Sequence, residues 1–598
     1  MKTTRLIMIL AALCLCLSGC SAPAGAPVPT LPPLVETNPL GTTQDIAVTE
    51  EASEVAPEEQ GPSIQTSRQQ TASGALSDGV QFIVYQDGEL VLSGKPLTAR
   101  LHSEPMLQPH LEKITRITFS GGVTAVASGS CENLTAVNTL SFGQDVASVA
   151  SYAFSGCTAV NTIHWGSVTT IGDYAFTGCS ALRHLALTGT QVTHLGSHAF
   201  DGCASLQSVH LGSSITSMGS SVFAGCNALA TLTVEGSVLP GAFSGCSALT
   251  DVTIGGQATA IGSNAFSGCT ALKNVMLAHA VQEIGSSAFS GCSSLLSIVV
   301  TDDPANPHVL YNITSIGARA FSGCTALSSV YLNAGAVGDY AFERCTALTT
   351  ATLTRNVQSI GTEIFSGCTA LNTLTLDVSV PAHAFRNLTG LTVLTFGQHA
   401  ASIGDYAFDG CTGLVDCTLP QNIASVGSYA FQGCTKLNAM TIGAHVTTLG
   451  EYVFKGCSNM KYLTVDMPEI PKFAFAGITG LTDLTITDNV KIIGESAFAE
   501  CTALVEVDLP EGELPQKDVT GKGVSHIHNY AFSKCTSLIR IRLPRSLQEI
   551  GYGIFSGCQS LDRMVFYSTE TRWDRVKKPS TGWDAGAAFR KYYSNYGW

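Results

Sequence analysis

The sequence is poor in charged residues, which make up only 13% of its 598 positions. It has 31 basic and 45 acidic residues, a formal net charge of −14, and no long basic run after its first residues. Because binding to a phosphate backbone needs clustered Lys and Arg, we expect no nucleic-acid partner. No hydrophobic run of transmembrane length follows the N-terminal region, so only the N-terminal end can direct the chain to a membrane.

Motifs for catalysis and metal binding are missing as well. The sequence has no G-x-S-x-G, H-E-x-x-H, P-loop or G-x-G-x-x-G motif, and no close C-x-x-C pair of the kind typical of metal sites. His526 and His528 flank Ile527 and could suggest a metal site, but no third ligand is evident. We therefore interpret both histidines as solvated surface and predict a protein without enzymatic activity, cofactor or bound metal.

The N-terminus has the features of an export signal. Lys2 and Arg5 are followed by an apolar run, Leu6 to Leu17, that is too short to span a bilayer comfortably. The run ends in Leu17-Ser18-Gly19-Cys20, which resembles the bacterial lipobox, although a plain signal peptide with a chance cysteine is the alternative. The resemblance implies a signal peptide over residues 1–19 and a lipid attached to Cys20, which would hold the protein at a membrane surface without spanning it.

The next segment has the composition of a spacer. Residues 21–74 are rich in Pro, Ala, Thr, Glu and Gln and almost free of aromatic residues, so they cannot bury enough apolar surface to offset the entropy of ordering. We predict a disordered linker over residues 20–75, an N-terminal cap over residues 76–129, and the folded repeats after it.

A repeated segment dominates the rest of the chain. Stretches such as AFSGCTAL, at residues 265–272 and again at 320–327, recur throughout, and their phenylalanines are mostly 23 residues apart. A degenerate unit with Cys131 in place of the phenylalanine precedes them. The motif phenylalanines are Phe154, Phe176, Phe200, Phe223, Phe243, Phe266, Phe289, Phe321, Phe342, Phe365, Phe385, Phe408, Phe431, Phe454, Phe475, Phe498, Phe532 and Phe555.

Each unit reads as a short helical turn, an L-x-L strand, a turn, and a second strand ending in V-x-x-I-G. Since one unit cannot bury its apolar side alone, we predict a solenoid of about 19 stacked units over residues 130–565. Its strands are short, parallel and about 4.8 Å apart. Insertions at 302–311 and 511–524 are expected to be surface loops. Units of 20 or 21 residues, ending at Phe243, Phe342, Phe385 and Phe475, are expected to lack the full second strand.

The signature I-G-x-x-A-F-x-G-C-x-x-L-x-x-L-x-L, which covers residues 130 to 565, resembles the BspA-type leucine-rich repeats of bacterial surface lipoproteins. The flanks are similar too: residues 80–94 resemble the hairpin that commonly precedes such repeats, and residues 566–598 the tail that closes them. We therefore expect a C-terminal cap over 566–598 that contains Trp573 and Trp583. The resemblance implies display on the bacterial cell envelope, outside the cytoplasm, and binding of host or neighbouring-cell proteins.

The cysteines follow the repeat rather than a disulfide pattern. Of the 21, three lie at residues 14, 16 and 20, 16 follow a motif phenylalanine by three residues, and Cys131 and Cys417 remain. Units without the cysteine have Leu388 or Ile478 in its place, which favours a buried thiol that packs as a small apolar group. We interpret the series as an unbridged core ladder, with some disulfides or bound metal as alternatives.

The middle residue of each L-x-L should point away from the core, so these residues form a column along the solenoid, here called the central column. A wide, weakly charged face of this kind suits an extended protein, and its larger side chains, with neighbouring Tyr462, are the candidate contact points. The alternative is that threonine is present only as a good strand former. The column holds Ser141, His164, Ala186, His210, Thr233, Thr253, Met276, Val299, Tyr331, Thr352, Thr375, Thr395, Thr418, Thr441, Thr464, Thr485, Asp508, Arg542 and Val565.

Taken together, the sequence predicts a surface-displayed, lipid-anchored solenoid that binds protein ligands along the central column. Recognition of cell-wall glycan or another polysaccharide is the alternative, although exposed aromatic residues are sparse along the column. A passive spacer would not need a tailored column. Contact with the membrane is expected only through the lipid at Cys20.

Overall fold

The computed structural model describes residues 68–300, 309–310, 313–511, 522–584 and 589–593. All of them belong to one structural unit, Arg68–Trp598. The predicted signal peptide with Cys20, the linker up to residue 67 and most of the two insertions lie outside the described residues. Within them the chain winds into about 21 stacked turns, so the predicted solenoid is confirmed and is slightly longer than the 19 units of the sequence pattern.

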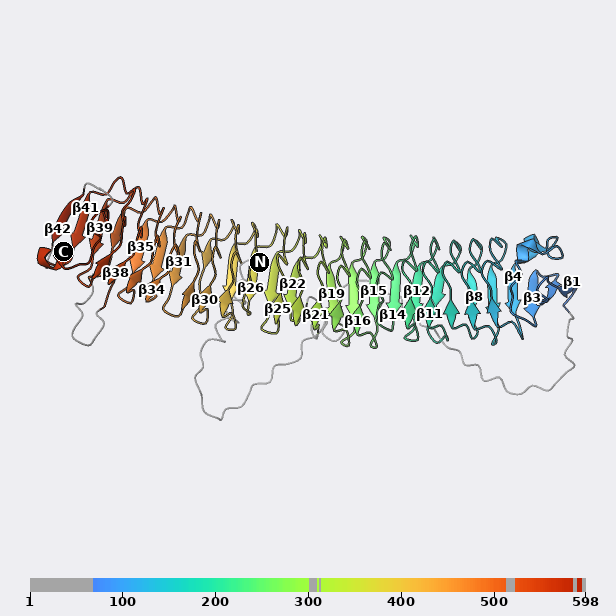
Figure 1. The fold of residues 1–598 in the computed structure, drawn as a ribbon. Helices are drawn as coiled ribbons and strands as arrows, with labels where there is room; N and C mark the ends of the chain where they lie inside the picture. Colours follow the sequence, from blue (N-terminus) through green and yellow to red (C-terminus); the bar gives the residue numbers. More distant parts are fainter. Residues whose placement is uncertain (1–67, 301–308, 311–312, 512–521, 585–588, 594–598) are drawn as a thin grey trace, which may run out of the picture. The chain divides into compact units, whose positions relative to one another are not determined.

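The L-x-L segments form the first row of parallel strands, drawn as large arrows in Figure 1. It falls into three sheets, with breaks between β8 and β10 and between β19 and β20. Its strands are β4 (Arg116–Phe119), β6 (Thr139–Phe142), β8 (Thr162–His164), β10 (His184–Ala186), β12 (Ser208–Leu211), β14 (Thr231–Val234), β15 (Asp251–Ile254), β17 (Asn274–Leu277), β19 (Ser297–Val300), β20 (Val309–Leu310), β22 (Ser329–Leu332), β24 (Thr350–Leu353), β26 (Thr373–Leu376), β27 (Val393–Phe396), β29 (Asp416–Cys417), β31 (Ala439–Ile442), β33 (Tyr462–Val465), β35 (Asp483–Ile486), β37 (Glu506–Asp508), β39 (Arg540–Leu543) and β41 (Arg563–Phe566).

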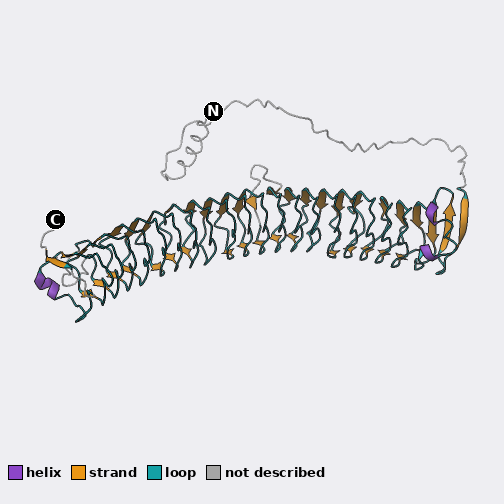
Figure 2. Ribbon diagram, turned by 90° about the horizontal axis from the view of Figure 1, so that it is seen from above, coloured by secondary structure: helices purple, strands orange, loops and turns teal. Residues whose placement is uncertain are grey.

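The second row consists of two-residue strands on the other side of the stack (Figure 2), and in most coils a glycine comes directly after the strand. Each pairs in parallel with its equivalent in a neighbouring coil. These strands are β5 (Ala125–Val126), β7 (Ser148–Val149), β9 (Thr170–Ile171), β11 (His194–Leu195), β13 (Ser217–Met218), β16 (Ala260–Ile261), β18 (Glu283–Ile284), β21 (Ser315–Ile316), β23 (Ala336–Val337), β25 (Ser359–Ile360), β28 (Ser402–Ile403), β30 (Ser425–Val426), β32 (Thr448–Leu449), β34 (Glu469–Ile470), β36 (Ile492–Ile493), β38 (His526–Ile527) and β40 (Glu549–Ile550).

The A-F-x-G-C segment forms consecutive turns where the sequence pattern suggested a short helix. In one coil the N–H groups of Tyr152, Phe154 and Gly156 donate to carbonyl groups of the next coil at 2.9, 2.8 and 2.8 Å. Tyr152 and Gly156 also have positive φ angles of 58° and 74°. Because every second N–H is used between coils, and because left-handed residues interrupt the right-handed path, the i to i−4 bonds of an α-helix cannot form.

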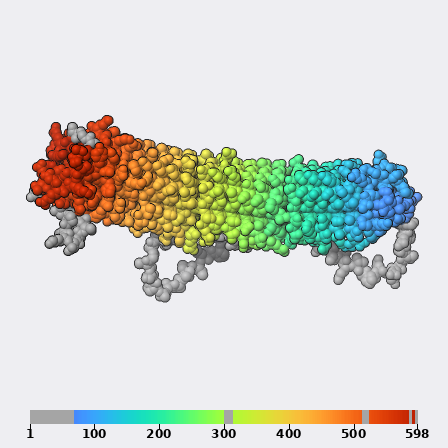
Figure 3. Space-filling model, viewed as in Figure 1, coloured from blue at the N-terminus to red at the C-terminus, as the bar shows by residue number. Residues whose placement is uncertain are grey.

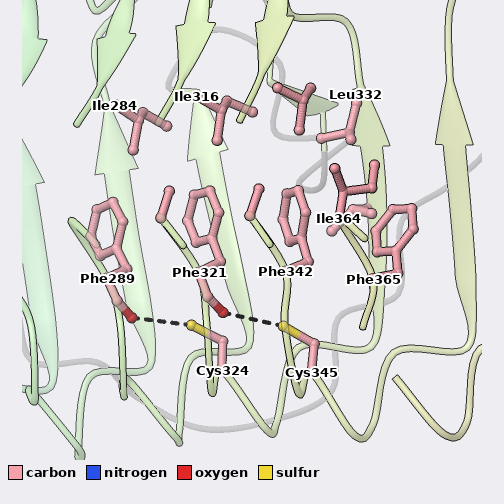
Figure 4. Packing of buried hydrophobic residues seen from close by; sticks show 14 of the residues in the cluster. Ile284, Phe289, Ile316, Phe321, Cys324, Leu332, Phe342, Cys345, Ile364 and Phe365 are labelled. Carbon is pink, nitrogen blue, oxygen red and sulfur yellow. Dashed lines mark hydrogen bonds between the residues drawn. The ribbon is translucent and has the colours of Figure 1, made fainter. Parts of the chain in front are cut away.

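The motif phenylalanines form a continuous stack through the core. From Phe154 to Phe532 each ring lies against the ring of the next coil, with centroid distances from 5.1 Å to 6.3 Å. Figure 4 shows Phe289, Phe321 and Phe342 of three successive coils. The Phe289–Phe321 spacing stays at 5.4 Å although these residues flank the first insertion. The insertion therefore leaves the core stack intact.

The repeat cysteines lie beside these rings. All 18 cysteines among the described residues are buried free thiols. In most coils the thiol donates to the carbonyl oxygen of the preceding coil's phenylalanine, as Cys345 does to Phe321 at 3.2 Å (Figure 4). The predicted core position of the cysteines is confirmed. The sequence pattern gave no sign of the carbonyl acceptor, because it belongs to a different coil.

The N-terminal end is closed by an antiparallel strand arrangement. β1 (Gln70–Ala75) pairs with β2 (Gln81–Tyr85), and β2 with β3 (Glu89–Ser93) in the expected hairpin; β3 then runs parallel to β4. Two 3-10 turns, η2 (Leu101–Ser103) and η3 (Leu111–Lys113), follow the hairpin. Placing residues 70–75 in a disordered linker was wrong, because the backbone of this segment pairs with β2 despite its small, polar side chains. β4 and β5 also build a repeat-like coil before residue 130, within the range expected for the cap.

The C-terminal end is closed by α2 (Glu570–Asp574), the only α-helix among the described residues, and by β42 (Arg590–Tyr593), which pairs in parallel with β41. The Trp573 ring on α2 is buried and contacts Phe566 and Trp583, at centroid distances of 5.3 and 5.5 Å. These rings cover the apolar end of the last coil. Both tryptophans therefore lie where a capping role requires them.

The shortened units differ in part from expectation. The units that end at Phe342 and Phe475 keep two-residue second strands, β23 and β34. In the other two the second strand is reduced to a single bridge, made by Val238 and by Val380. The expectation that all four lack the full second strand is therefore wrong for the 21-residue units.

Candidate binding face of the solenoid

The central column lies on the outer side of the first strand row. Thr352 pairs with Tyr331 on one side and with Thr375 on the other, and Thr375 pairs with Thr395. Thr441, Thr464 and Thr485 are aligned in the same way. Because residues flanking each column residue point into the core, the column residues project outward together. In Figure 3 residues of successive units occupy successive bands of the surface, so a patch that spans several strands contains residues from several units.

The large side chains predicted as contact points are exposed. Met276 is 44% exposed, Tyr331 is 39% exposed and Tyr462 is 51% exposed, and His164 and His210 are also exposed. Tyr462 lies at the start of β33, beside the column, and aligns with Ala439 and Asp483. These side chains therefore lie at separate points along the strand face.

The threonines of the column differ in exposure. Thr395, Thr418, Thr441 and Thr485 are exposed, whereas Thr352, Thr375 and Thr464 are half-buried between neighbouring strands. They form a polar surface of similar small side chains between the larger groups.

The column is not continuous along the whole face. Strand pairing stops between His164 on β8 and Ala186 on β10, so the two column histidines, His164 and His210, belong to different sheets. Tyr331 pairs with Val309 of β20 instead of with the column residue of β19. Sequence reasoning treated the column as one uninterrupted ribbon. The inserted β20 and the buried Trp165 after His164 mark two of the places where the fold divides it.

A third irregularity creates a hollow within the threonine region. β29 has only two residues and pairs with β31 at a single position, Asp416 with Ala439. Beside it lies a pocket of about 360 Å³ lined by Asp416, Thr418, Thr441 and His445 among others. The Nε2 atom of His445 is buried and has no hydrogen-bond partner. The pocket lining therefore combines an imidazole ring with two hydroxyl groups and a carboxylate.

A stack of aromatic rings on the turn side was not predicted from the sequence. The residue two positions before each motif phenylalanine has a positive φ angle, and in many coils it is a tyrosine. Neighbouring rings stack at centroid distances of 4.8 to 5.3 Å in the series His383, Tyr406, Tyr429, Tyr452 and Phe473. The recurring D-Y-A-F and similar segments were the available signal, but stacking depends on which coils are adjacent.

The strand face ends in a cluster of arginines that the sequence reading also missed. Arg542 was recognised only as a column residue, whereas Arg540 and Arg563 lie on the same face beside it and line a common pocket. The alternation of arginine with isoleucine in residues 540–542 was the available signal. The partner strands β41 and β42 could not be assigned to this cluster before the pairing was known.

The described residues contain no group of three or more His, Cys, Asp or Glu side chains that could hold a metal ion. His526 is half-buried and its Nδ1 lies 2.8 Å from the Ser525 hydroxyl, while His528 is exposed. In the part of the chain that the structure describes, no helix is long and apolar enough to cross a bilayer.

Comparison with known proteins adds the family. A family model described as BspA type Leucine rich repeat region (6 copies) matches residues 110–230, 232–334, 305–381, 378–505 and 468–571. The chain belongs to this BspA-type family. No curated protein matches it in sequence.

Three solved structures are similar to the chain. A leucine-rich repeat protein from Bacteroides ovatus is 25% identical, with a TM-score of 0.42, over 67% of this chain and 87% of that chain. A leucine rich cell surface protein from Faecalibacterium prausnitzii is 19% identical, with a TM-score of 0.23, over 85% and 98% of the two chains. The pneumococcal vaccine antigen PcpA is 15% identical, with a TM-score of 0.22, over 88% and 99%.

Proposed function

We propose that this BspA-type protein is displayed on a bacterial cell surface and binds a protein of the host or of a neighbouring cell along its central column. The observation that carries the proposal is the aligned outer face of the first strand row, on which Met276, Tyr331 and Tyr462 stand out as large exposed groups. Repeat solenoids serve as scaffolds for extended binding surfaces, and large aromatic residues contribute most to binding energy at interfaces. A non-enzymatic role fits this architecture.

Surface display is the second part of the proposal. It is supported by the family and by the lipobox-like residues before Cys20, which would tether the mature chain to the membrane by lipid. The polar segment after Cys20 would then act as a spacer between membrane and solenoid. The proposed location is the cell envelope, outside the cytoplasm.

The test is capture of ligands by the full chain from host and envelope fractions, followed by binding measurements on each captured protein. Tyr331→Ala is compared with Thr418→Ala, because both positions belong to the column and differ mainly in the contact area they offer. We expect Tyr331→Ala to weaken binding by about 2 kcal/mol or more, and Thr418→Ala to have little effect. Equal, negligible effects at both positions would remove the ligand from the central column.

Recognition of a cell-wall glycan or another polysaccharide is the second candidate, and the pocket at Thr418 and Thr441 favours it. The unpartnered Nε2 of His445 and the Asp416 carboxylate could hydrogen-bond to sugar hydroxyl groups. Under this alternative, purified polysaccharide would bind the chain, and His445→Ala would weaken that binding while Tyr331→Ala would not.

A further inference from the structure

Three arginines are aligned on adjacent strands at the C-terminal end of the strand face. Arg540 on β39 pairs with Arg563 on β41, and Arg563 pairs with Arg590 on β42. Like charges directly opposite each other on neighbouring strands destabilise a sheet. The alignment therefore needs counter-charges, which Glu506 supplies to Arg540 and Asp562 to Arg563.

Two of these arginines, Arg540 and Arg563, border a pocket of about 480 Å³ that opens on the strand face. Its wall contains Arg540, Arg542 and Arg563, and the rest is formed by Val565 and three tyrosines, of which Tyr592 is 41% exposed. The guanidinium groups of the arginines thus surround a surface formed by valine and tyrosine side chains. We call the pocket lined by Arg540, Arg542 and Arg563 the arginine pocket.

Acidic residues on the preceding strand hold two of the arginines in place. The Arg542 guanidinium is ion-paired with Asp508, and Arg540 with Glu506. The Tyr567 hydroxyl also donates to Asp508 at 3.1 Å, which fixes the carboxylate between ring and guanidinium. Since a guanidinium has five N–H donors, a carboxylate on one side leaves donors for a second acceptor.

Arg563 is the most available of the three. Its side chain is 55% exposed, and its ion-pair partner is the adjacent Asp562, at 3.2 Å. The corresponding side chains of Arg540 and Arg542 are 30% and 26% exposed. Arg563 therefore stands at the mouth of the pocket, while the other two form its inner wall.

We propose that the arginine pocket binds an acidic peptide segment, with a carboxylate held by Arg540 and Arg563 and the neighbouring apolar part of the peptide against Tyr592. A planar guanidinium matches a carboxylate with two parallel hydrogen bonds, and arginine and tyrosine are both enriched at the centres of protein interfaces. This proposal rests on the proposed function, because it takes the ligand to be a protein. It adds the chemistry of the ligand segment that binds.

The charge around the pocket argues for a short acidic segment over a long sulfated polysaccharide. Glu506 and Asp508 are already paired with pocket arginines, and the strand face beyond them carries the exposed Asp483. The chain as a whole has a formal net charge of −14. A polyanion that extended along the face would meet these carboxylates, and binding of long polyanions needs an extended basic track. A short acidic segment can contact Arg563, the most exposed of the pocket arginines, without extending along these carboxylates.

The experiment uses the full chain purified in detergent and a fluorescently labelled octapeptide of alternating Glu and Val, followed by fluorescence anisotropy at low salt. A peptide with Gln in place of Glu tests the need for carboxylates, and a sulfated hexasaccharide tests the alternative anion. Arg563→Gln removes the charge, and Arg563→Lys keeps the charge but removes the planar guanidinium group that forms two parallel hydrogen bonds. Arg355→Gln, at an exposed arginine elsewhere in the solenoid, is the matched control.

We expect the Glu peptide to bind and the Gln peptide not to bind. Arg563→Gln should weaken binding at least about tenfold, Arg563→Lys should weaken it by an intermediate factor, and Arg355→Gln should leave it unchanged. Because Arg563 is largely exposed, its substitutions should preserve the thermal unfolding profile, which is measured alongside.

The inference would be overturned by a lack of binding of the Glu peptide, or by arginine-dependent binding of the hexasaccharide without binding of the peptide. Failure here is separate from failure of the proposed function, which is tested at Tyr331. A captured protein ligand whose affinity falls with Tyr331→Ala but not with Arg563→Gln would leave the central column in place and reject the arginine pocket.

Discussion

The thiol sulfur of Cys324 lies 3.3 Å from the carbonyl oxygen of Phe289, although 35 residues separate them in sequence. The same carbonyl also accepts the backbone N–H of Cys292, at 3.1 Å, within its own coil. The thiol is thus a second, inter-coil donor to a carbonyl that is already satisfied. A serine hydroxyl at position 324 would therefore have a hydrogen-bond acceptor, the Phe289 carbonyl oxygen.

We expect Cys324→Ser to be tolerated better than a substitution of Cys131 by Ser. The serine hydroxyl at 324 can donate to Phe289, whereas the buried Cys131 thiol donates to no acceptor among the described contacts. A buried hydroxyl without a partner costs about 1–3 kcal/mol, and a hydrogen-bonded one recovers about 1 kcal/mol of this. Urea unfolding of the two variants measures the difference.

Equal losses of stability in the two variants would show that the thiol contact to Phe289 has no energetic role. Cys324→Ala serves as the control for lost volume, because it removes the sulfur without adding a polar group.

Alkaline pH should destabilise the solenoid. Burial raises the pKa values of the Cys417 and Cys501 thiols to about 12, from the ordinary value of 9.0. In the unfolded chain these thiols lose their protons above about pH 9, while in the folded chain they keep them, so folding stability is complete below pH 9 and falls from there towards pH 12. Urea midpoints measured between pH 8 and pH 11 should decrease.

Removing two of the thiols provides the control for this pH dependence, because lysines and tyrosines also titrate in that range. The double variant Cys411→Ala/Cys501→Ala should show a shallower decrease than the unmodified chain, since burial also raises the Cys411 thiol to a pKa of about 12. If the urea midpoint of the double variant fell with pH as steeply as that of the unmodified chain, other titrating groups would cause the loss of stability at alkaline pH.

The left-handed position before the motif phenylalanine should reject β-branched residues. Tyr429 has a φ angle of 58°, and its ring stacks on Tyr406 and Tyr452 at 4.8 and 5.2 Å. Both Tyr429→Val and Tyr429→Asn remove the stacking, but only asparagine adopts this backbone conformation readily. Tyr429→Val should therefore unfold at a lower temperature, with about 1 kcal/mol less stability than Tyr429→Asn.

Similar melting temperatures for these two variants would indicate that the backbone at this turn relaxes. Ser287 has nearly the same φ angle, 55°, and carries no aromatic ring, so Ser287→Val isolates the backbone penalty from the loss of stacking.

The proposed tether predicts that Cys20→Ala releases the protein from membranes. Without the thiol no lipid can be attached, and the apolar run at residues 6–17 is too short to hold the chain stably in a bilayer. Fractionation of expressing cells should move the variant from the membrane pellet to the medium or the soluble fraction. Retention in the pellet equal to that of the unmodified chain would reject the lipid anchor.

The repeat, the buried positions and the outward-facing column all follow from the residue pattern. Phe289, Cys292 and the strand residues of each unit could be assigned to the core because their pattern recurs with a short, fixed period, and because one unit cannot bury these residues alone. The resemblance to BspA-type repeats rested on the same residues. It also indicated the caps, although the pairing of residues 70–75 with β2 depended on backbone bonds that their side chains do not signal.

Which residues lie side by side on the surface depends on how the coils pack against each other. The turns around Tyr152 and Phe154 could not be distinguished from a helix in the sequence, because their N–H groups bond to carbonyls of the next coil. The alignment of Arg540, Arg563 and Arg590, the break between His164 and Ala186, and the pocket beside His445 depend on which coils pair and where pairing stops. Register between strands more than 20 residues apart is a property of the assembled stack, so it becomes visible only when the coils are folded against each other.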